Sequence, residues 1–201
     1  MSGQAASPPI YGLLLSGGAS NRMQRDKAHV EYRGEPQLLR AWRLLGQVTE
    51  RAFVSVREDQ GDDPLRAGLP MLVDSYDSIG PTAGILSAQD AYPGAAWLVL
   101  ACDLPLLNVA TLRSLLAQRD PAADATAFTS RHDGLPEPLC AIWEPASHAL
   151  LLERYESGQF CPRKALLRSN SRLLSSPGQA LDNINTPADL EAMRSALEAR
   201  P

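Results

Sequence analysis

The sequence predicts an α/β fold with a doubly wound, mostly parallel β-sheet. Short apolar segments with the length of buried strands alternate with longer amphipathic segments, and this alternation is typical of a parallel sheet covered by helices. The most apolar of the short segments, residues 96–101, has the composition of a central strand. Because ligands of doubly wound folds bind at the carboxyl ends of the strands, functional residues are expected directly after them.

Each element of this fold has a local signal. A strand at 11–15 ends at a glycine turn, and a short alternating strand at 29–32 leads to a helix that Pro36 opens. The segment 57–68 is rich in Asp, Gly and Arg, which is the composition of a surface loop or lid. Further strands are expected at 52–56, 70–73, 96–101, 124–129 and 139–143, and further helices after the turn at 80–84, at 109–118 with Asn108 as N-cap, at 145–155 and after Thr186.

The bulk composition indicates one globular domain with an acidic net charge. With 201 residues, of which 44% are hydrophobic, the chain can bury a core, and we expect a single domain at 10–201 after a loose tail at 1–9. The net charge of −4 argues against a protein that binds nucleic acid or an anionic membrane. No segment approaches the ~20 apolar residues of a membrane span.

Cysteine usage favours a reducing compartment. The three cysteines, Cys102, Cys140 and Cys161, are odd in number and never form a C-x-x-C pair. Neither a disulfide framework nor a zinc site is therefore expected. This pattern predicts a cytoplasmic protein.

The turn after the first strand carries the strongest signal for a ligand. At Gly17 and Gly18 the chain exposes backbone N–H groups with no Cβ in the way, and the cations Arg22, Arg25 and Lys27 follow within ten residues. Backbone N–H groups and side-chain cations together suit a polyphosphate. On an acidic chain, this local excess of positive charge indicates a small anionic ligand.

Lys27 is informative because this chain uses arginine for almost every cation. The 19 basic residues include only two lysines, Lys27 and Lys164. An ammonium group is a compact charge on a thin stem and can enter a crowded phosphate site that a planar guanidinium cannot. A lysine retained by chance is the alternative, but a position directly after a glycine-rich turn favours a functional lysine.

Two acids follow predicted strands. Asp74 ends the strand at 70–73 and precedes the turn 80–84, which is either a nucleotide contact or a plain connection between a strand and a helix. Asp103 emerges from the apolar strand at 96–101, where Mg²⁺ is commonly held by one or two carboxylates and substrate phosphates. Asn108 is the better cap for the next helix, so Asp103 remains available as a metal ligand.

Residues 15–27, L-S-G-G-A-S-N-R-M-Q-R-D-K, resemble the L-x-G-G-x-S-x-R-M-G-x-D-K signature of nucleotidyltransferases in its molybdenum cofactor guanylyltransferase (MobA-like) form. They depart from it at Ser16, where the family usually has Ala, and at Gln24, where it usually has Gly. Four further stretches resemble family elements, namely the D-x(n)-G-P-x-A-G element from Asp74 to Gly84, the C-D-x-P element at 102–105, the P-x-P-L-x-A segment at 136–141 and the N-x-N-T-P element at 183–187.

The resemblance implies a Rossmann-like nucleotidyltransferase domain with its nucleotide-binding half at about 10–107 and its acceptor-binding half at about 108–201. It implies catalytic roles for Arg22 and Lys27, and Asp103 as the Mg²⁺ ligand. The implied nucleotide-binding residues are Leu15, Ser16, Gly17, Gly18, Lys27, Ser55, Asp74, Gly84 and Asp103.

The acceptor is expected to bind in the second half. Arg163 and Lys164 form a basic cluster that composition alone would place on a solvated helix face, whereas the resemblance places it near the pterin phosphate. Asn183 and Asn185 alternate along a short predicted strand, so both amides can face one cleft, and they match the acceptor-site element of the family.

The resemblance implies transfer of GMP from GTP to molybdopterin, with Mg²⁺ as cofactor and release of pyrophosphate. The alternatives are a molybdopterin cytidylyltransferase, a sugar-phosphate nucleotidyltransferase, or a non-catalytic scaffold that binds nucleotide. We expect a cytoplasmic monomer that meets molybdoenzymes or their chaperones but neither nucleic acid nor membrane. Residues alone, without the resemblance, indicate only a Mg²⁺-dependent nucleotide binder of the phosphoryl-transfer type.

Overall fold

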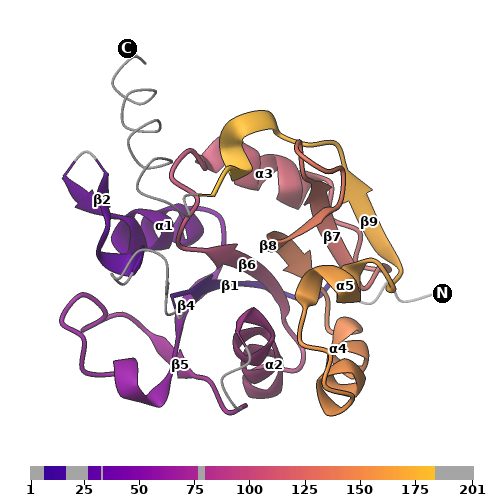
Figure 1. The fold of residues 1–201 in the computed structure, drawn as a ribbon, viewed down its shortest axis with the longest axis horizontal. Coiled ribbons are helices and arrows are strands. Elements are labelled where there is room, and N and C mark those ends of the chain that lie inside the picture. Colours follow the sequence, from indigo (N-terminus) through magenta and orange to yellow (C-terminus); the bar gives the residue numbers. More distant parts are fainter. Residues whose placement is uncertain (1–6, 17–26, 33, 77–79, 184–201) are drawn as a thin grey trace.

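The computed structural model describes residues 7–16, 27–32, 34–76 and 80–183 (Figure 1). The strands are β1 (Ile10–Leu15), β2 (Glu31–Tyr32), β3 (Glu35–Pro36), β4 (Arg51–Val56), β5 (Met71–Val73), β6 (Ala96–Ala101), β7 (Ala125–Thr129), β8 (Pro136–Trp143) and β9 (Ser171–Leu174). The helices are α1 (Gln37–Gly46), α2 (Pro81–Ala91), α3 (Val109–Ala117), α4 (Ser147–Glu156) and α5 (Pro162–Leu166), with 3₁₀ turns η1 (Lys27–His29), η2 (Glu58–Gln60) and η3 (Gly178–Leu181).

The main sheet has seven strands in the order β5-β4-β1-β6-β8-β7-β9, and β2 and β3 form a separate hairpin. The pairs β5–β4, β4–β1, β1–β6 and β7–β9 are parallel, whereas β8 runs antiparallel to both of its neighbours. Leu15 pairs with Ser55 on one side and with Ala101 on the other, so β1, β4 and β6 end at the same level. The predicted doubly wound, mostly parallel sheet is confirmed.

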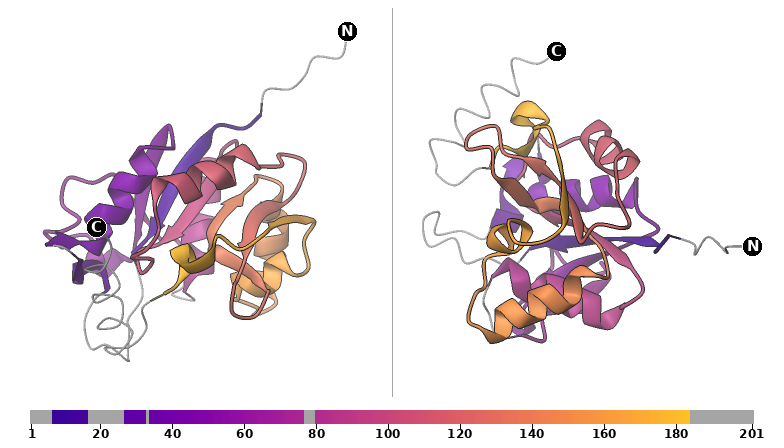
Figure 2. Two further views of the ribbon diagram at one scale, coloured as in Figure 1. Left: turned by 90° about the horizontal axis from the view of Figure 1, so that it is seen from above. Right: turned by 90° about the vertical axis from the view of Figure 1, so that its right-hand side faces the viewer.

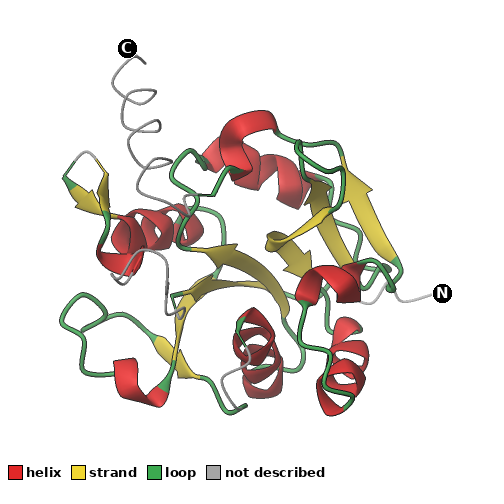
Figure 3. Cartoon of the chain, viewed as in Figure 1, coloured by secondary structure: helices red, strands yellow, loops and turns green. Residues whose placement is uncertain are grey.

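Helices cover both faces of this sheet (Figures 1 and 3). Successive residues of β1 point to opposite faces, because Leu14 belongs to the hydrophobic cluster under α1 and α3, whereas Leu13 belongs to the cluster under α2, α4 and α5. Trp97 and Leu98 divide in the same way on β6, which is completely buried and lies in the middle of the sheet. The views in Figure 2 show the same layers from two other sides.

Three local predictions differ from the structure. The strand expected at 29–32 is shorter, because η1 takes up residues 27–29 and β2 covers only Glu31–Tyr32. The strand expected at 139–143 is longer, since β8 begins at Pro136 and pairs with Thr129 beyond an irregularity in β7. The connection 57–68 is not a surface loop throughout, because Arg66 is only 1% exposed.

One further prediction about local structure is confirmed. The Asn108 side chain accepts a hydrogen bond from the backbone N–H of Thr111 and caps α3. All three cysteines are free thiols. Within the described ranges, no helix combines the length and apolarity that a membrane span requires. The predicted helix after Thr186 lies outside the described residues.

Candidate active site

Hydrogen bonds join the carboxyl ends of three neighbouring strands. The hydroxyl of Ser16, the first residue after β1, donates to the carbonyl oxygen of Ser55 in β4 at 2.9 Å. The hydroxyl of Ser55 in turn donates to the Oδ1 carboxylate oxygen of Asp74, which follows β5, at 2.7 Å. Ser16 and Ser55 are 3% and 2% exposed, so these bonds lie away from solvent. The structure thus brings together three residues that the sequence assigned to the nucleotide pocket.

Gly84 lies against the same edge. A Cβ built on Gly84 would approach the Ser55 Oγ to 2.5 Å and the Leu15 Cδ2 to 2.8 Å. Only a residue without a side chain allows the first turns of α2 to pack this closely on β1 and β4. Leu15, Ser55 and Gly84 therefore form one packed unit under the carboxyl edge of the sheet.

Asp74 is a half-buried carboxylate whose environment disfavours its charge. Burial raises the pKa of Asp74 above its ordinary value, and the hydrogen bond from Ser55 and the positive charge of Arg57 offset part of this rise. A carboxylate held at a strand end by one hydroxyl retains further lone pairs for a ligand. Asp74 can therefore accept hydrogen bonds from a bound nucleotide without losing Ser55.

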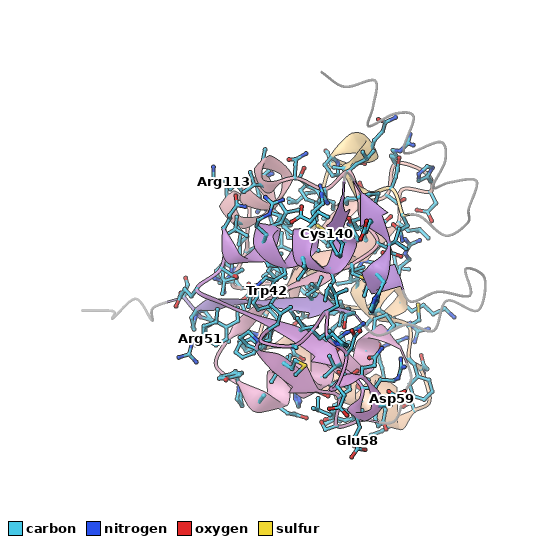
Figure 4. The ribbon with its side chains drawn as sticks, turned by 90° about the vertical axis from the view of Figure 1, so that its left-hand side faces the viewer. Trp42, Arg51, Glu58, Asp59, Arg113 and Cys140 are labelled. Carbon is cyan, nitrogen blue, oxygen red and sulfur yellow. The ribbon has the colours of Figure 1, made fainter. Side chains whose placement is uncertain are left out.

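Arg66 is a site residue that the sequence analysis missed. Its Nε donates to the Ser16 Oγ at 3.1 Å and its Nη2 to the Ser16 carbonyl at 3.2 Å. Glu58 and Asp59 of the same connection lie at the surface in Figure 4, whereas the side chain of Arg66 is buried. An arginine in a segment of Asp and Gly gives no local sign of burial, and only the tertiary contact with Ser16 identifies it.

Asp103 follows β6 in a tight turn at the same edge. The Arg40 guanidinium of α1 donates to the carbonyls of Leu104 and Leu107 and so holds the chain that follows Asp103. The residues that the structure describes contain no group of three or more His, Cys, Asp or Glu side chains that could hold a metal. One carboxylate at a strand end still suits Mg²⁺, which commonly takes one or two protein carboxylates and completes its shell with substrate phosphates and water.

A cleft of about 100 Å³ opens beside the carboxyl end of β6. Its walls come from the end of β6 with Leu104, the beginning of β8, α5 and the chain after η3. Two of the predicted acceptor residues, Arg163 and Asn183, line it, whereas Lys164 is exposed and does not. The cleft lies next to Asp103 along the chain, because Ala101 and Leu104 both contribute to its wall.

Carboxylates balance the charge of Arg163. Its Nη1 pairs with Asp133 and its Nη2 with Glu137, each at 2.9 Å. Of the predicted basic cluster, the charge of Arg163 is therefore compensated. Asp182, beside Asn183, is held in the same manner by Arg131 at 2.8 Å and His132 at 3.0 Å.

Several predicted site residues cannot be placed. Gly17, Gly18, Arg22 and Asn185 lie outside the described residues, and so does Gln24. For Lys27 the structure describes only the backbone, which begins η1.

Comparisons with known proteins place this sequence among nucleotidyltransferases. A family model described as a MobA-like NTP transferase domain matches residues 12–173. A molybdenum cofactor guanylyltransferase from Pseudomonas putida is 30% identical over 92% of this chain and 98% of its own length. A molybdenum cofactor biosynthesis bifunctional protein from Synechocystis is 38% identical over 90% of this chain, which spans about half (52%) of that relative.

The fold also matches a solved structure. The molybdopterin-guanine dinucleotide biosynthesis protein A of Archaeoglobus fulgidus superimposes with a TM-score of 0.79 at 21% identity, over 94% of this chain and 98% of that one. At this identity the match establishes a shared fold, while the family follows from the sequence matches. The chain belongs to the family of MobA-like NTP transferases.

Proposed function

We propose that this protein transfers GMP from GTP to molybdenum-loaded molybdopterin, forms molybdopterin guanine dinucleotide and releases pyrophosphate. The observation that carries the proposal is that one edge of the sheet holds two adjoining features. One is the set of hydrogen-bonded and packed strand-end residues Ser16, Ser55, Asp74 and Gly84. The other is the cleft lined by Arg163 and Asn183. Relatives named molybdenum cofactor guanylyltransferase support the choice of nucleotide and acceptor.

On the nucleotide side, the strand ends provide hydrogen-bonding groups at fixed positions. Ser55 and Asp74 orient one another, and Gly84 lets α2 approach without filling the space above β1 and β4. We assign to this side the base and ribose of GTP, which offer donors and acceptors rather than charge. The glycine turn after Ser16, with Arg22 and Lys27, is proposed to hold the triphosphate.

The reaction needs compensation of charge more than it needs a base. The attacking phosphate oxygen of the acceptor is already anionic near neutral pH, so no side chain has to take its proton. Each histidine pairs with a carboxylate, namely Asp63 for His29, Asp182 for His132 and Asp90 for His148, as expected for structural histidines. Bound Mg²⁺ would supply further positive charge at the phosphates, and Asp103 would hold it.

On the acceptor side, Arg163 and Asn183 would hold the phosphate and the polar edge of the pterin. A guanidinium binds phosphate through two parallel N–H groups. Arg163 could bind the acceptor phosphate in this way once its hydrogen bond to Asp133 or Glu137 is broken. The cleft lies next to Asp103 in the chain, which suits attack on a phosphorus atom bound at the neighbouring nucleotide side.

The test is pyrophosphate release in the presence of Mg²⁺, with GTP or CTP and with or without molybdenum-loaded molybdopterin. Release that requires the pterin and prefers GTP supports the proposal. A preference for CTP would identify a cytidylyltransferase instead. Binding of GTP without release of pyrophosphate under any of these conditions would point to a scaffold.

A further inference from the structure

We propose that Arg66, together with Asp63, is a positioning residue that holds Ser16 and the turn Lys27–His29, the two segments on either side of residues 17–26. The inference rests on the proposed function, because it takes Ser16 and the segment beginning at Lys27 as parts of the nucleotide site. It adds to that function two residues from the connection between β4 and β5. Neither residue lies in the signature at 15–27.

Arg66 binds the first residue after β1. Its Nε and Nη2 donate to the side-chain and backbone oxygens of Ser16, so two nitrogens of one rigid guanidinium hold one residue. The Ser16 hydroxyl donates its hydrogen to the Ser55 carbonyl, so the hydroxyl oxygen can accept a hydrogen bond from Arg66. The direction in which the chain leaves β1 is therefore determined by two partners from other segments.

Asp63 connects Arg66 to His29, in the turn that follows residues 17–26. The remaining guanidinium nitrogen of Arg66, Nη1, donates to the Asp63 Oδ2. The same carboxylate oxygen lies 2.9 Å from the His29 Nε2. His29 ends η1, the turn that Lys27 begins. One ion pair thus connects the residue before the glycine turn with the residue two positions after the predicted catalytic lysine.

Burial protects the part of this connection that Arg66 makes. Arg66 is 1% exposed and the Asp63 side chain 16%, so water competes little for the hydrogen bonds of Arg66, whereas the His29 side chain, at 51% exposed, meets Asp63 at the surface. The pair continues through Ser16 and Ser55 to Asp74, so one hydrogen-bonded chain crosses the ends of β1, β4 and β5. A nucleotide that binds here finds its partners already oriented, which lowers the entropic cost of binding.

Ser16 is also one of the two departures from the family signature. Alanine, the usual residue, could neither accept from the Arg66 Nε nor donate to the Ser55 carbonyl. The serine and the buried arginine therefore act as a pair, and the pair predicts non-additive effects when both are changed.

The experiment compares Arg66→Lys with a matched control, Arg119→Lys. Arg119 is another arginine with little exposure, 9% for its side chain, and its Nε and Nη2 pair with Glu144 at 2.6 and 2.8 Å. Glu144 follows the antiparallel strand β8, so this pair lies at the opposite edge of the sheet. A lysine keeps the charge at either position but cannot donate in three directions from separate nitrogens.

We expect Arg66→Lys to weaken binding of Mg²⁺·GTP about tenfold, the loss expected when hydrogen bonds to a charged group are removed. The KM for GTP should rise to match, while kcat at saturating GTP and the KM for the acceptor stay within about twofold. Arg119→Lys should lower the melting temperature similarly but leave GTP affinity unchanged. Ser16→Ala, a milder change, should weaken GTP binding less, and adding it to Arg66→Lys should cost less than the sum.

Hydrogen exchange of the protein without nucleotide tests the geometry separately. Arg66→Lys should accelerate exchange in peptides that contain Ser16 and His29, and Arg119→Lys should not. Wild-type GTP affinity in Arg66→Lys, or exchange there equal to that of the control, would overturn the inference while leaving GMP transfer intact. If the wild type neither binds nor uses GTP, the proposed function fails. The exchange result alone then decides whether Arg66 and Asp63 hold Ser16 and His29 in place.

Discussion

The two sides of the candidate site are held together in different ways. On the nucleotide side, a buried network of Arg66, Ser16 and Ser55, each at most 3% exposed, joins the strand ends. On the acceptor side, the residues are held by ion pairs in contact with solvent. The side chains of Arg163 and Asp133 are 32% and 43% exposed, for example.

The difference indicates which side is formed before substrate arrives. Buried hydrogen bonds are not exchanged for water, so the nucleotide side keeps one geometry. Exposed ion pairs are weak, worth about 0–1 kcal/mol, so under the proposed function Arg163 would exchange a carboxylate for a substrate phosphate at little cost. We therefore expect changes on the nucleotide side to affect both folding and GTP binding, and changes on the acceptor side to affect acceptor binding with only small effects on folding.

The largest effect is expected at Asp103, which lies where the two sides meet. Asp103→Ala should lower kcat by at least about 100-fold, because the proposed Mg²⁺ ligand and its charge compensation at the phosphates are lost. Initial rates of pyrophosphate release measure this, with the exposed Asp62→Ala as control. A folded Asp103→Ala protein with wild-type turnover would remove Asp103 from the site.

The next effect is expected at Gly84. Gly84→Ala should destabilise the protein by about 1–3 kcal/mol, because its Cβ would collide with Ser55 and Leu15, and it should weaken GTP binding in parallel. Gly46→Ala is the matched control, since no atom lies within 4 Å of a Cβ built there. At the end of α1 that change should be neutral or slightly stabilising. Urea unfolding checks both, and equal stabilities would show that the edge is not tightly packed.

A smaller effect is expected at Arg163 and its partner Glu137, where substitutions should change the KM for the acceptor in opposite directions. Arg163→Gln should raise the KM for the acceptor several-fold, roughly the value of one charged hydrogen bond, and leave GTP affinity unchanged. Glu137→Gln should lower that KM, because it frees one guanidinium nitrogen. Steady-state kinetics with each substrate varied in turn give the answer. If both variants raised the KM equally, Arg163 would be acting as a structural ion pair.

The smallest effects are on stability as a function of pH, and they have opposite signs on the two sides. The pKa of Asp74 is raised, chiefly by burial, so the folded state favours its protonated form, and stability falls as pH rises through that pKa. Asp74→Asn should therefore be neutral or stabilising at pH 7, with the gain fading towards the ordinary pKa of 3.8. It should also weaken GTP binding.

Asp182 gives the opposite result. Burial alone would raise its pKa, but hydrogen bonds from Arg131 and His132 outweigh this and lower the pKa below the ordinary 3.8. Its stabilisation is present above the unfolded-state pKa and is lost as pH falls through the lowered value. Asp182→Asn should thus destabilise slightly at pH 7 and have no effect in strong acid. Urea unfolding of both variants across pH tests the signs, and equal signs would contradict the comparison.

Much of this organisation could be predicted from the sequence. The lengths and apolar character of 11–15, 52–56 and 96–101 predicted parallel strands, and the polar residues after them were predicted to lie together at one edge of the sheet. The order of the strands could not be predicted, because it depends on pairing between distant segments, such as that of β6 with β8. The same holds for the compensation of Arg163, whose partners lie 26 and 30 residues away.

The sequence by itself determined the strand–turn pattern, the signature at 15–27 and hence the family, since these depend on residues that are close together along the chain. Only the tertiary structure decided that Arg66, from a segment with the composition of a surface loop, lies buried under Ser16, 50 residues away. The physical reason is that burial of a charge depends on the partners folding brings to it. From the local composition, burial of Arg66 is expected to be unfavourable, because the composition does not show the hydrogen bonds that compensate for it.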